Sequence, residues 1–228
     1  MPDIKLPIGT YSFYNQLQQC PHKAYHVYVG RTLPYVETPE MAWGNKVHKA
    51  MENRIKYAVP LPEEMAAAEP SAAVFHDYST KIVVRCEWQL AMDINGQPCD
   101  YNDYSKVWFR GKLDCVTLDS ALTFAWEVDW KTGNVREDPF ELETGALLLK
   151  VHHTNLETIK GEYFWMKTGQ NGLRYTFNKH GETYQKLVNL RAEAESYFRA
   201  GVWPKRKSPL CNWCAVKSCE NYTGKNVK

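Results

Sequence analysis

The sequence predicts a mixed α/β domain, because helical and strand-like segments alternate along a chain of ordinary globular composition. The clearest strand signal is the stretch from 122 to 131, where hydrophobic and polar residues alternate without a break. Two strand-like segments precede it, and helix start and stop signals lie on both sides. With 228 residues, 44% of them hydrophobic and 24% charged, the chain is long enough for one sizeable domain.

Capping residues and helix breakers set the predicted helices. Thr10 or Ser12 caps the first helix, and Cys20-Pro21 ends it. Thr38 is the N-cap of the next helix, with Pro39 at its first position. Helices are therefore expected at about 10–19, 38–58, 138–153 and 179–200, with one or two short helices between 62 and 78.

The predicted strands are rich in β-branched or aromatic residues and are bounded by turns. Asn95-Gly96 follows the first strand, and Asp119-Ser120 separates the second from the third closely enough for a hairpin. Strands are expected at about 81–92, 106–118, 122–131, 162–167 and 173–178.

The strand at 122–131 is predicted to be half buried, with one hydrophobic and one polar face. The polar face carries Glu127, Asp129 and Lys131. The alternation places Asp129 and Lys131 side by side at the end of the strand, before Thr132-Gly133 breaks it. An acid beside a lysine suits metal-assisted phosphodiester cleavage if further ligands lie nearby. Glu127 has no partner that the sequence identifies.

The sequence also indicates the cellular compartment. No stretch approaches the roughly 20 apolar residues of a membrane span, and the N-terminus lacks the form of a signal peptide. We therefore expect a cytosolic, reducing compartment and no membrane partner. Seven cysteines are then thiols or metal ligands rather than disulfides.

The net charge of +2 gives no global argument for a nucleic-acid partner. The segment from 203 to 228 differs, because it holds six Lys or Arg residues against the single acid Glu220. Trp203, Trp213 and Tyr222 are interleaved with these basic residues and are candidates for stacking on single-stranded bases. The alternative is that the two tryptophans are packed inside the protein, which we favour for Trp213.

Two carboxylates and a histidine are candidate metal ligands. Asp114 lies late in one predicted strand and Asp129 late in the next, so pairing of these strands brings both to one hard divalent cation. A surface ion pair between Asp129 and Lys131 is the alternative. His48 shares a helix face with Gly44 and Glu52, and a glycine within a helix suggests close approach of a backbone or a substrate.

In combination, these residues resemble the PD-(D/E)XK nuclease superfamily, and its RecB-type branch most closely. The similarity rests on the order of three motifs, Gly44-x-x-Val47-His48-x-x-x-Glu52, Gly111-Lys112-Leu113-Asp114 and Asp129-Trp130-Lys131-Thr132-Gly133, and extends over residues 11 to 219. It implies a restriction-endonuclease-like core, with a central mixed sheet flanked by helices.

The resemblance also implies roles. His48, Asp114 and Asp129 would bind Mg²⁺ or Mn²⁺, with the backbone carbonyl of Trp130 as a further ligand. Lys131 would be the catalytic lysine, and Glu52 would assist from the helix. The branch usually carries a Gln-x-x-x-Tyr element on the following helix, where this chain has Glu141 and Gly145.

Three cysteines, Cys211, Cys214 and Cys219, form a C-x2-C-x4-C cluster, which points to a bound metal or iron–sulfur cluster if a fourth ligand exists. The resemblance supplies that ligand as Cys20 and implies a 4Fe–4S cluster. Zinc at the same four cysteines and free thiols are the alternatives. Cys86, Cys99 and Cys115 are interpreted as small apolar fillers.

We therefore expect a single nuclease domain over 1–228, with a core at about 38–200 and with segments 10–30 and 203–222 joined by the cluster. The expected function is that of a metal-dependent DNA nuclease, an exonuclease on single-stranded DNA or DNA ends. The family suggests a bacterial or phage-infected cell, a role in phage recombination, replication or repair, and a protein partner from those processes. The competing hypothesis is a non-catalytic nucleic-acid-binding module that keeps the fold and the cluster.

Overall fold

In a computed structural model, the chain is described over residues 5–79 and 82–224. These residues form two compact units. One unit is continuous and comprises Glu37–Tyr184, and the other combines Met1–Val36 with Gln185–Lys228. They are called the sheet unit and the terminal unit below. Lys81, Lys225 and Lys228, which contribute to the predicted first strand and basic tail, lie outside the described residues.

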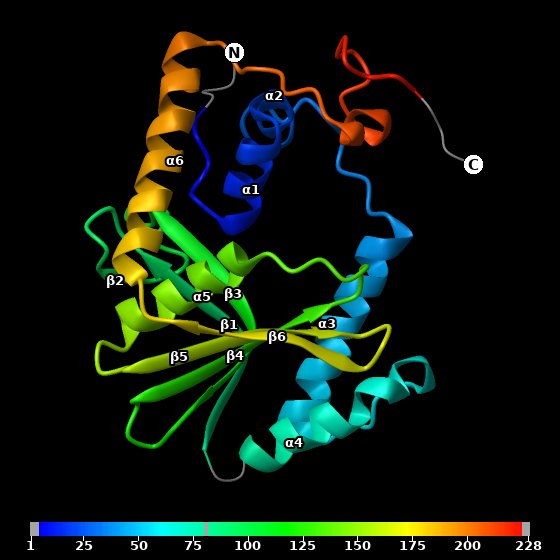
Figure 1. The fold of residues 1–228 in the computed structure, drawn as a ribbon, viewed down its shortest axis with the longest axis vertical. Helices are drawn as coiled ribbons and strands as arrows, with labels where there is room; N and C mark the ends of the chain where they lie inside the picture. Colours follow the sequence, from blue (N-terminus) through cyan, green and yellow to red (C-terminus); the bar gives the residue numbers. More distant parts are fainter. Residues whose placement is uncertain (1–4, 80–81, 225–228) are drawn as a thin grey trace. The chain divides into compact units, whose positions relative to one another are not determined.

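The sheet unit is built on a six-stranded sheet in the order β2-β1-β3-β4-β5-β6 (Figure 1). Neighbouring strands are antiparallel except β4 and β5, which are parallel. The sheet is therefore mixed, as expected from the sequence. The strands are β1 (Val83–Met92), β2 (Pro98–Cys99), β3 (Phe109–Leu118), β4 (Phe124–Lys131), β5 (Thr158–Trp165) and β6 (Gln170–Phe177).

Helices cover both faces of this sheet (Figure 1). On one face, α3 (Pro39–Tyr57), the short helix η2 (Glu63–Ala68) and α4 (Glu69–Ser79) form a hydrophobic core with the strands. Helix α5 (Pro139–His152) packs on the other face. It connects β4 to β5, as a parallel pair of strands requires.

The predicted helix starts are confirmed at α1, α3 and α5. The hydroxyl of Thr38 accepts a hydrogen bond from the backbone of Met41 at 3.3 Å, and Pro39 begins α3. Asp138 caps α5 in the same way through the backbone of Phe140. Such caps satisfy backbone donors that have no partner within the helix.

The expectation that the strand at 122–131 is half buried is wrong. Glu127 on its polar face is only 5% exposed, and Ala125 is fully buried. Strand β4 lies between β3 and β5, and α5 covers the face that carries these residues. The carboxylate and the lysine of this strand are therefore placed in a protected environment rather than on a solvated surface.

The terminal unit contains α1 (Tyr11–Gln19), α2 (Pro21–Ala24), the π-helical turn η1 (Tyr25–Val29) and the 3₁₀ turn η3 (Pro209–Trp213). The boundary between the units falls within α6 (His180–Ala200). Thr10 caps α1, and Arg206 of the C-terminal segment donates to the backbone oxygen of Gln18 at 2.5 Å. The two ends of the chain thus contribute to one unit.

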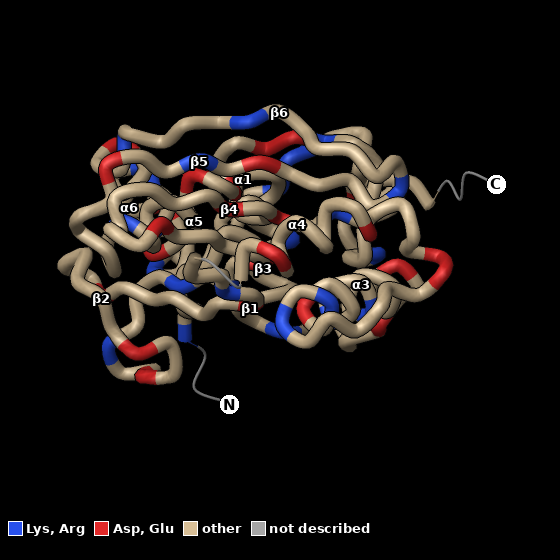
Figure 2. Tube along the Cα trace, turned by 90° about the horizontal axis from the view of Figure 1, so that it is seen from below, with Lys and Arg blue, Asp and Glu red and all other residues tan. Residues whose placement is uncertain are grey.

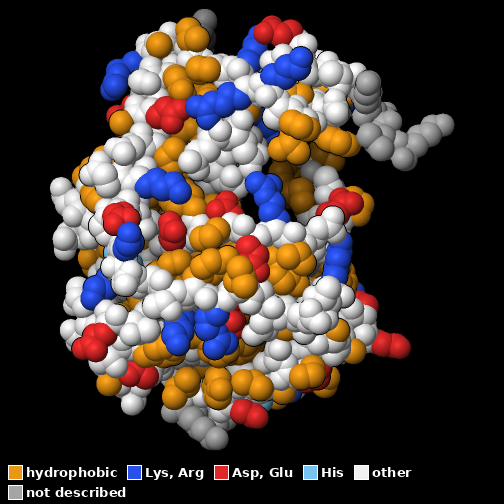
Figure 3. All heavy atoms as spheres, in the orientation of Figure 1, with side chains coloured by type: hydrophobic (Ala, Val, Ile, Leu, Met, Phe, Trp, Pro, Cys, Tyr) orange, Lys and Arg blue, Asp and Glu red, His pale blue; other side chains and the backbone are white. Residues whose placement is uncertain are grey.

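Acidic and basic residues are interspersed along the sheet unit (Figure 2). Basic side chains lie among hydrophobic ones on the face that carries β6 (Figure 3). There the guanidinium of Arg174 lies 4.9 Å from the ring centre of Trp126, at cation–π distance. Within the described part of the chain, none of the helices combines the length and apolar character needed to cross a bilayer.

Candidate metal centre and cysteine pocket

The candidate metal centre lies where β3 and β4 part. Their pairing runs from Leu118 opposite Ala125 to Cys115 opposite Val128, and Asp114 and Asp129 come next on the two strands. From there β4 continues beside β5, and β3 beside β1. One link spans the gap, because the backbone N–H of Trp130 donates to Oδ2 of Asp114 at 2.8 Å.

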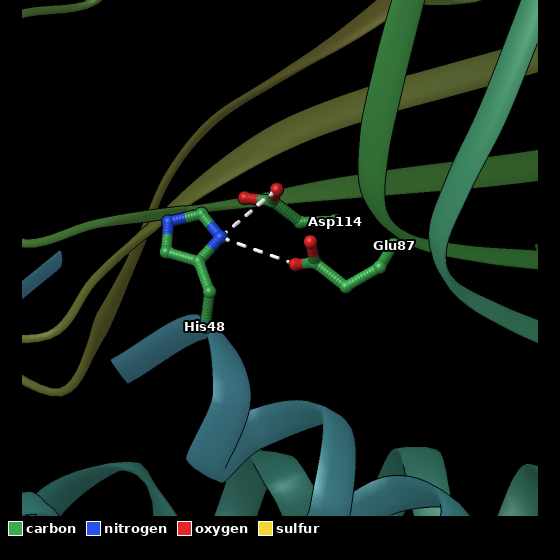
Figure 4. Close-up of side chains that lie close together, drawn as sticks. All are labelled: His48, Glu87 and Asp114. Carbon is green, nitrogen blue, oxygen red and sulfur yellow. Dashed lines mark hydrogen bonds and ion pairs between the residues drawn. The ribbon is translucent and has the colours of Figure 1, made fainter. Parts of the chain in front are cut away.

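His48 reaches this gap from α3 and meets two carboxylates (Figure 4). Its Nδ1 atom lies 3.1 Å from Oδ1 of Asp114 and 3.3 Å from Oε1 of Glu87. One ligand atom from each residue lies within 4.8 Å of the other two, and among the described residues this is the one such group of three. The structure therefore brings together two predicted ligands, His48 and Asp114, and adds Glu87.

This group fits a hard divalent cation. Magnesium binds oxygen ligands at about 2.1 Å in an octahedron, so neighbouring ligands stand about 3 Å apart. The two distances from His48 match that spacing. The two carboxylates suit Mg²⁺ or Mn²⁺, whereas an imidazole is a ligand more typical of softer transition metals.

The two carboxylates also control the charge of His48. Burial lowers the pKa of the imidazole, but hydrogen bonds to Asp114 and Glu87 outweigh burial and raise this pKa from 6.5 to about 10. Burial raises the pKa of Glu87, but hydrogen bonds from His48 and Lys112 lower it overall to about 2. Without a cation, the site is therefore held together by a protonated histidine between two carboxylates.

Lys131 is held beside the metal centre by two acids. Its Nζ atom lies 2.8 Å from Oδ2 of Asp129 and 2.8 Å from Oε2 of Glu141. It also lies 5.2 Å from the ring centre of Tyr163. Burial opposes the charge, but Asp129 and Glu141 raise the pKa of Lys131 overall, so the lysine is cationic. The ion pair predicted as the alternative to a metal site is thus present, but it is half-buried and adjoins Asp114 rather than standing alone on a surface.

Glu127 and Gly145 share one space between β4 and α5. A Cβ atom built on Gly145 would overlap the carboxylate of Glu127. Oε2 of Glu127 is buried and has no hydrogen-bond partner among the described residues. Burial, with the nearby charges of Asp129 and Asp114, raises the pKa of Glu127 well above 4.5.

Two predicted features of α3 lie away from the group of three. Glu52 is paired with Lys49 at 2.9 Å and with Lys56 at 2.7 Å. A Cβ atom on Gly44 would meet only the hydroxyl of Thr132, at 3.8 Å, which is an ordinary contact. No described protein atom therefore requires a glycine at position 44.

The residue that sequence reasoning missed is Glu87. It lies in a predicted strand, but its backbone φ is +53°, a left-handed conformation that is rare for glutamate. The only signal in the sequence is that Glu87 faces Asp114 if the two strands pair as observed. The long segment between β1 and β3, which contains β2, does not fix this register.

The four predicted cysteine ligands line one small cavity of the terminal unit. Cys20 lies between α1 and α2, and the other three lie in and after η3. All four are free and partly buried. No three of these sulfurs lie within 4.8 Å of one another, as measured over the described residues. Other residues lining the cavity include His22, Lys23, Lys205 and Arg206.

The two C-terminal tryptophans differ in environment. Trp203 is only 8% exposed and packs against Tyr25 and Tyr197. Trp213, which the sequence favoured as packed, is 61% exposed, so that prediction is wrong. It is the last residue of the short 3₁₀ turn η3, in which no residue is buried, and its ring is accessible to a partner.

Comparison with known proteins places these observations in a family. A family model described as the PD-(D/E)XK nuclease superfamily matches residues 10–219. A solved structure titled "Crystal structure of SSO0001" aligns with 92% of this chain and 85% of its own, at 13% sequence identity and a TM-score of 0.48. A search of curated proteins gave no match.

Proposed function

Because the chain belongs to the PD-(D/E)XK nuclease superfamily, whose members are metal-dependent nucleases, we propose that it is an exonuclease acting on single-stranded DNA or on DNA ends. One observation carries this proposal. His48 and Asp114 place ligand atoms close together next to the Asp129–Lys131 pair, at the point where β3 and β4 stop pairing. A ligand group with an adjoining half-buried lysine provides the charges that phosphodiester hydrolysis needs.

In this proposal, His48, Asp114 and Asp129 hold Mg²⁺ or Mn²⁺, and the carbonyl of Trp130 adds a ligand. The bound cation supplies Lewis acidity and lowers the pKa of a water molecule. The hydrogen bond from Trp130 to Asp114 fixes one oxygen of this carboxylate and leaves the other directed at His48. This arrangement supports a fixed orientation of the Asp114 carboxylate toward a cation that β3 and β4 would share.

Lys131 is proposed as the catalytic cation. Its ammonium group is an obligate donor, and its two acidic neighbours hold it at the gap. It would donate to the attacking water or to a phosphate oxygen on which charge develops. Glu141 stands where the family usually has glutamine, and it holds Lys131 by charge.

The preference for single strands rests on the terminal unit. Trp213 exposes a ring that can stack on a base, and Lys207 and Lys217 are exposed within the same unit. Exposed aromatic rings with nearby cations are typical of surfaces that bind single-stranded nucleic acid without sequence preference.

We also propose a 4Fe–4S cluster on Cys20, Cys211, Cys214 and Cys219. The shared cavity supports a common ligand. A tetrahedral zinc site with Zn–S bonds of about 2.3 Å places its sulfurs about 3.8 Å apart. No three of the described cysteine sulfurs lie within 4.8 Å of one another, so the proposal rests on the shared cavity and on the family resemblance.

Cleavage of labelled oligonucleotides tests the catalytic proposal. With Mn²⁺, we expect wild type to shorten single strands labelled at the 5′ or the 3′ end, and the two labels report the polarity. Asp114→Asn and Lys131→Ala should each reduce the rate by at least ~10²-fold, because each removes charge that stabilises the transition state. Lys106→Ala is the control, because Lys106 lies in the turn before β3 and its ion pair is with Asp103, at 3.5 Å, outside the candidate site.

Wild type that binds these oligonucleotides but cleaves neither single- nor double-stranded DNA would contradict the proposal. That result would favour the non-catalytic binding module instead.

A further inference from the structure

Glu87 is the member of the metal group that neither the motifs nor the family model assigns. It lies on β1 directly opposite Asp114 of β3, because the residues on either side pair as Cys86 with Cys115 and Trp88 with Leu113. Its side chain is 17% exposed. The position therefore places a largely buried carboxylate against the predicted ligand Asp114.

The two oxygens of Glu87 have different partners. Oε1 faces Nδ1 of His48 at 3.3 Å, and Oε2 forms an ion pair with Lys112. Lys112 is 46% exposed and pairs with the oxygen of Glu87 that His48 does not contact. One oxygen is thus paired with Lys112 of β3, while the other is directed at Nδ1 of His48, the same atom that faces Asp114 (Figure 4).

The geometry of this space suits a single cation that touches all three residues. The contacts of His48 with Asp114 and Glu87 measure 3.1 and 3.3 Å, close to the ~3 Å between neighbouring ligands of an octahedral Mg²⁺. Asp129 differs, because its Oδ2 atom is engaged by the ammonium of Lys131 at 2.8 Å. Of the acids near the gap, Glu87 is the one that the structure joins to His48 and Asp114 in one group.

We propose that Glu87 is a ligand of the divalent cation, so that α3, β1 and β3 each contribute one side chain to the metal site. This inference deepens the proposed nuclease function and rests on it. The binding site then includes a third protein ligand that does not share its charge with Lys131. A cation can accordingly be held by His48, Glu87 and Asp114 while Asp129 still pairs with Lys131.

Binding of Mn²⁺ to the full-length protein, measured from the EPR signal of the free ion, tests this role without relying on activity. Glu87→Gln keeps the shape of the side chain and an oxygen that accepts a hydrogen bond from His48, but it removes the charge. We expect this variant to bind Mn²⁺ at least ~10-fold more weakly than wild type. Glu87→Asp keeps the charge on a shorter side chain and should lie between the two.

Lys112→Met is the matched control, because it breaks the ion pair of Glu87 and leaves the carboxylate. Its Mn²⁺ affinity should equal or exceed that of wild type. If Lys112→Met and Glu87→Gln weaken binding equally, Glu87 serves only the ion pair and the inference is overturned. Equal affinity of Glu87→Gln and wild type overturns it as well.

The same preparations separate this inference from the proposed function. If wild type cleaves DNA and Glu87→Gln binds Mn²⁺ as tightly as wild type, Glu87 is not a metal ligand and the nuclease proposal stands. If instead Glu87→Gln binds Mn²⁺ more weakly than wild type but wild type cleaves no DNA, the metal site that includes Glu87 stands and the nuclease proposal fails. Circular dichroism of Glu87→Asp and Glu87→Gln establishes that both are folded.

Discussion

At the scale of single residues, the pair of Glu127 and Gly145 shows how a buried acid is accommodated beside the metal centre. The absence of a side chain at position 145 of α5 leaves the room that the carboxylate of Glu127 occupies on β4. The glutamate at 127 and the glycine at 145 are therefore expected to depend on each other.

Gly145→Ala should destabilise the protein by roughly 1–3 kcal/mol, because the added methyl group overlaps the carboxylate of Glu127, which is 5% exposed and would have to move within packed surroundings. Glu127→Ala should relieve much of this cost in the double variant, giving a coupling energy of roughly 0.5–3 kcal/mol in urea unfolding. Gly181→Ala in α6 is the control, since nothing described lies within 4 Å of its Cβ position. Additive effects of the two changes would exclude a shared space.

The pair of His48 and Glu87 should make stability depend on pH when hard divalent ions are absent. The pKa of His48 is raised from 6.5 to about 10, so its contribution is complete below pH 6.5 and is lost as the pH rises toward 10. The pKa of Glu87 is lowered from 4.5 to about 2, so its contribution is complete above pH 4.5 and is lost as the pH falls toward 2.

Glu87→Gln should therefore lower the free energy of unfolding most between pH 4.5 and 6.5, by roughly 1–3 kcal/mol. The difference should be smaller at pH 9, where His48 begins to lose its proton, and should persist in part because Lys112 remains charged. Urea titrations at pH 5.5 and pH 9 measure both values. A larger difference at pH 9 would contradict this coupling.

The residues of the site were predictable to different degrees. Asp114, Asp129 and Lys131 follow from alternation on two strands joined by a short turn, and the helix face of α3 identifies His48. Glu87 does not follow, because its positive φ interrupts the alternation on which the prediction of a strand face depends. A local backbone distortion of this kind is imposed by the tertiary structure and leaves no pattern in the sequence.

At the scale of elements, the fold was predictable where local signals were strong. The caps at Thr38 and Asp138 mark α3 and α5 as expected. Burial of both faces of β4 was not predictable, because it depends on α5 returning the chain to a parallel position beside β4. Strand order depends on pairing between segments that are far apart in the sequence, whereas alternation of hydrophobic and polar residues identifies only a single strand and its two faces.

Helix α3 offers a test that separates stability from function. Gly44→Ala should stabilise the protein by up to about 1 kcal/mol, because alanine is the better helix former and the new methyl group meets only Thr132. If Gly44 admits the DNA backbone, the same change should slow cleavage severalfold while raising the Tm. Unchanged cleavage by a stabilised variant would remove Gly44 from the substrate path. Ala50→Gly on the same helix reverses the stability change and serves as its control.

At the scale of the whole molecule, the cysteine pocket joins segments that are about 190 residues apart in the chain. Cys20→Ala should lose most of the bound iron and the absorbance near 400 nm that iron–sulfur thiolates give. It should also lower the Tm by at least ~4 °C if roughly 2 kcal/mol is lost, at about 2–4 °C per kcal/mol for a chain of this size. Cys99→Ala, outside the pocket, is the control and should keep its iron. Bound zinc without iron in wild type would contradict the cluster.

The division of the terminal unit between the two ends of the chain also sets an order for its biosynthesis. A ribosome that adds about 5–20 residues per second needs roughly 7–30 s to pass from residue 36 to residue 185. During that interval, Phe13 and Leu17, which are fully buried in the finished protein, have left the ribosome before the C-terminal half of their unit exists. The sheet unit, by contrast, is encoded without interruption and can acquire all its strands in sequence. The cluster proposed for Cys20 and its three partners therefore cannot be complete until Cys219 has been synthesised, about 200 residues after Cys20.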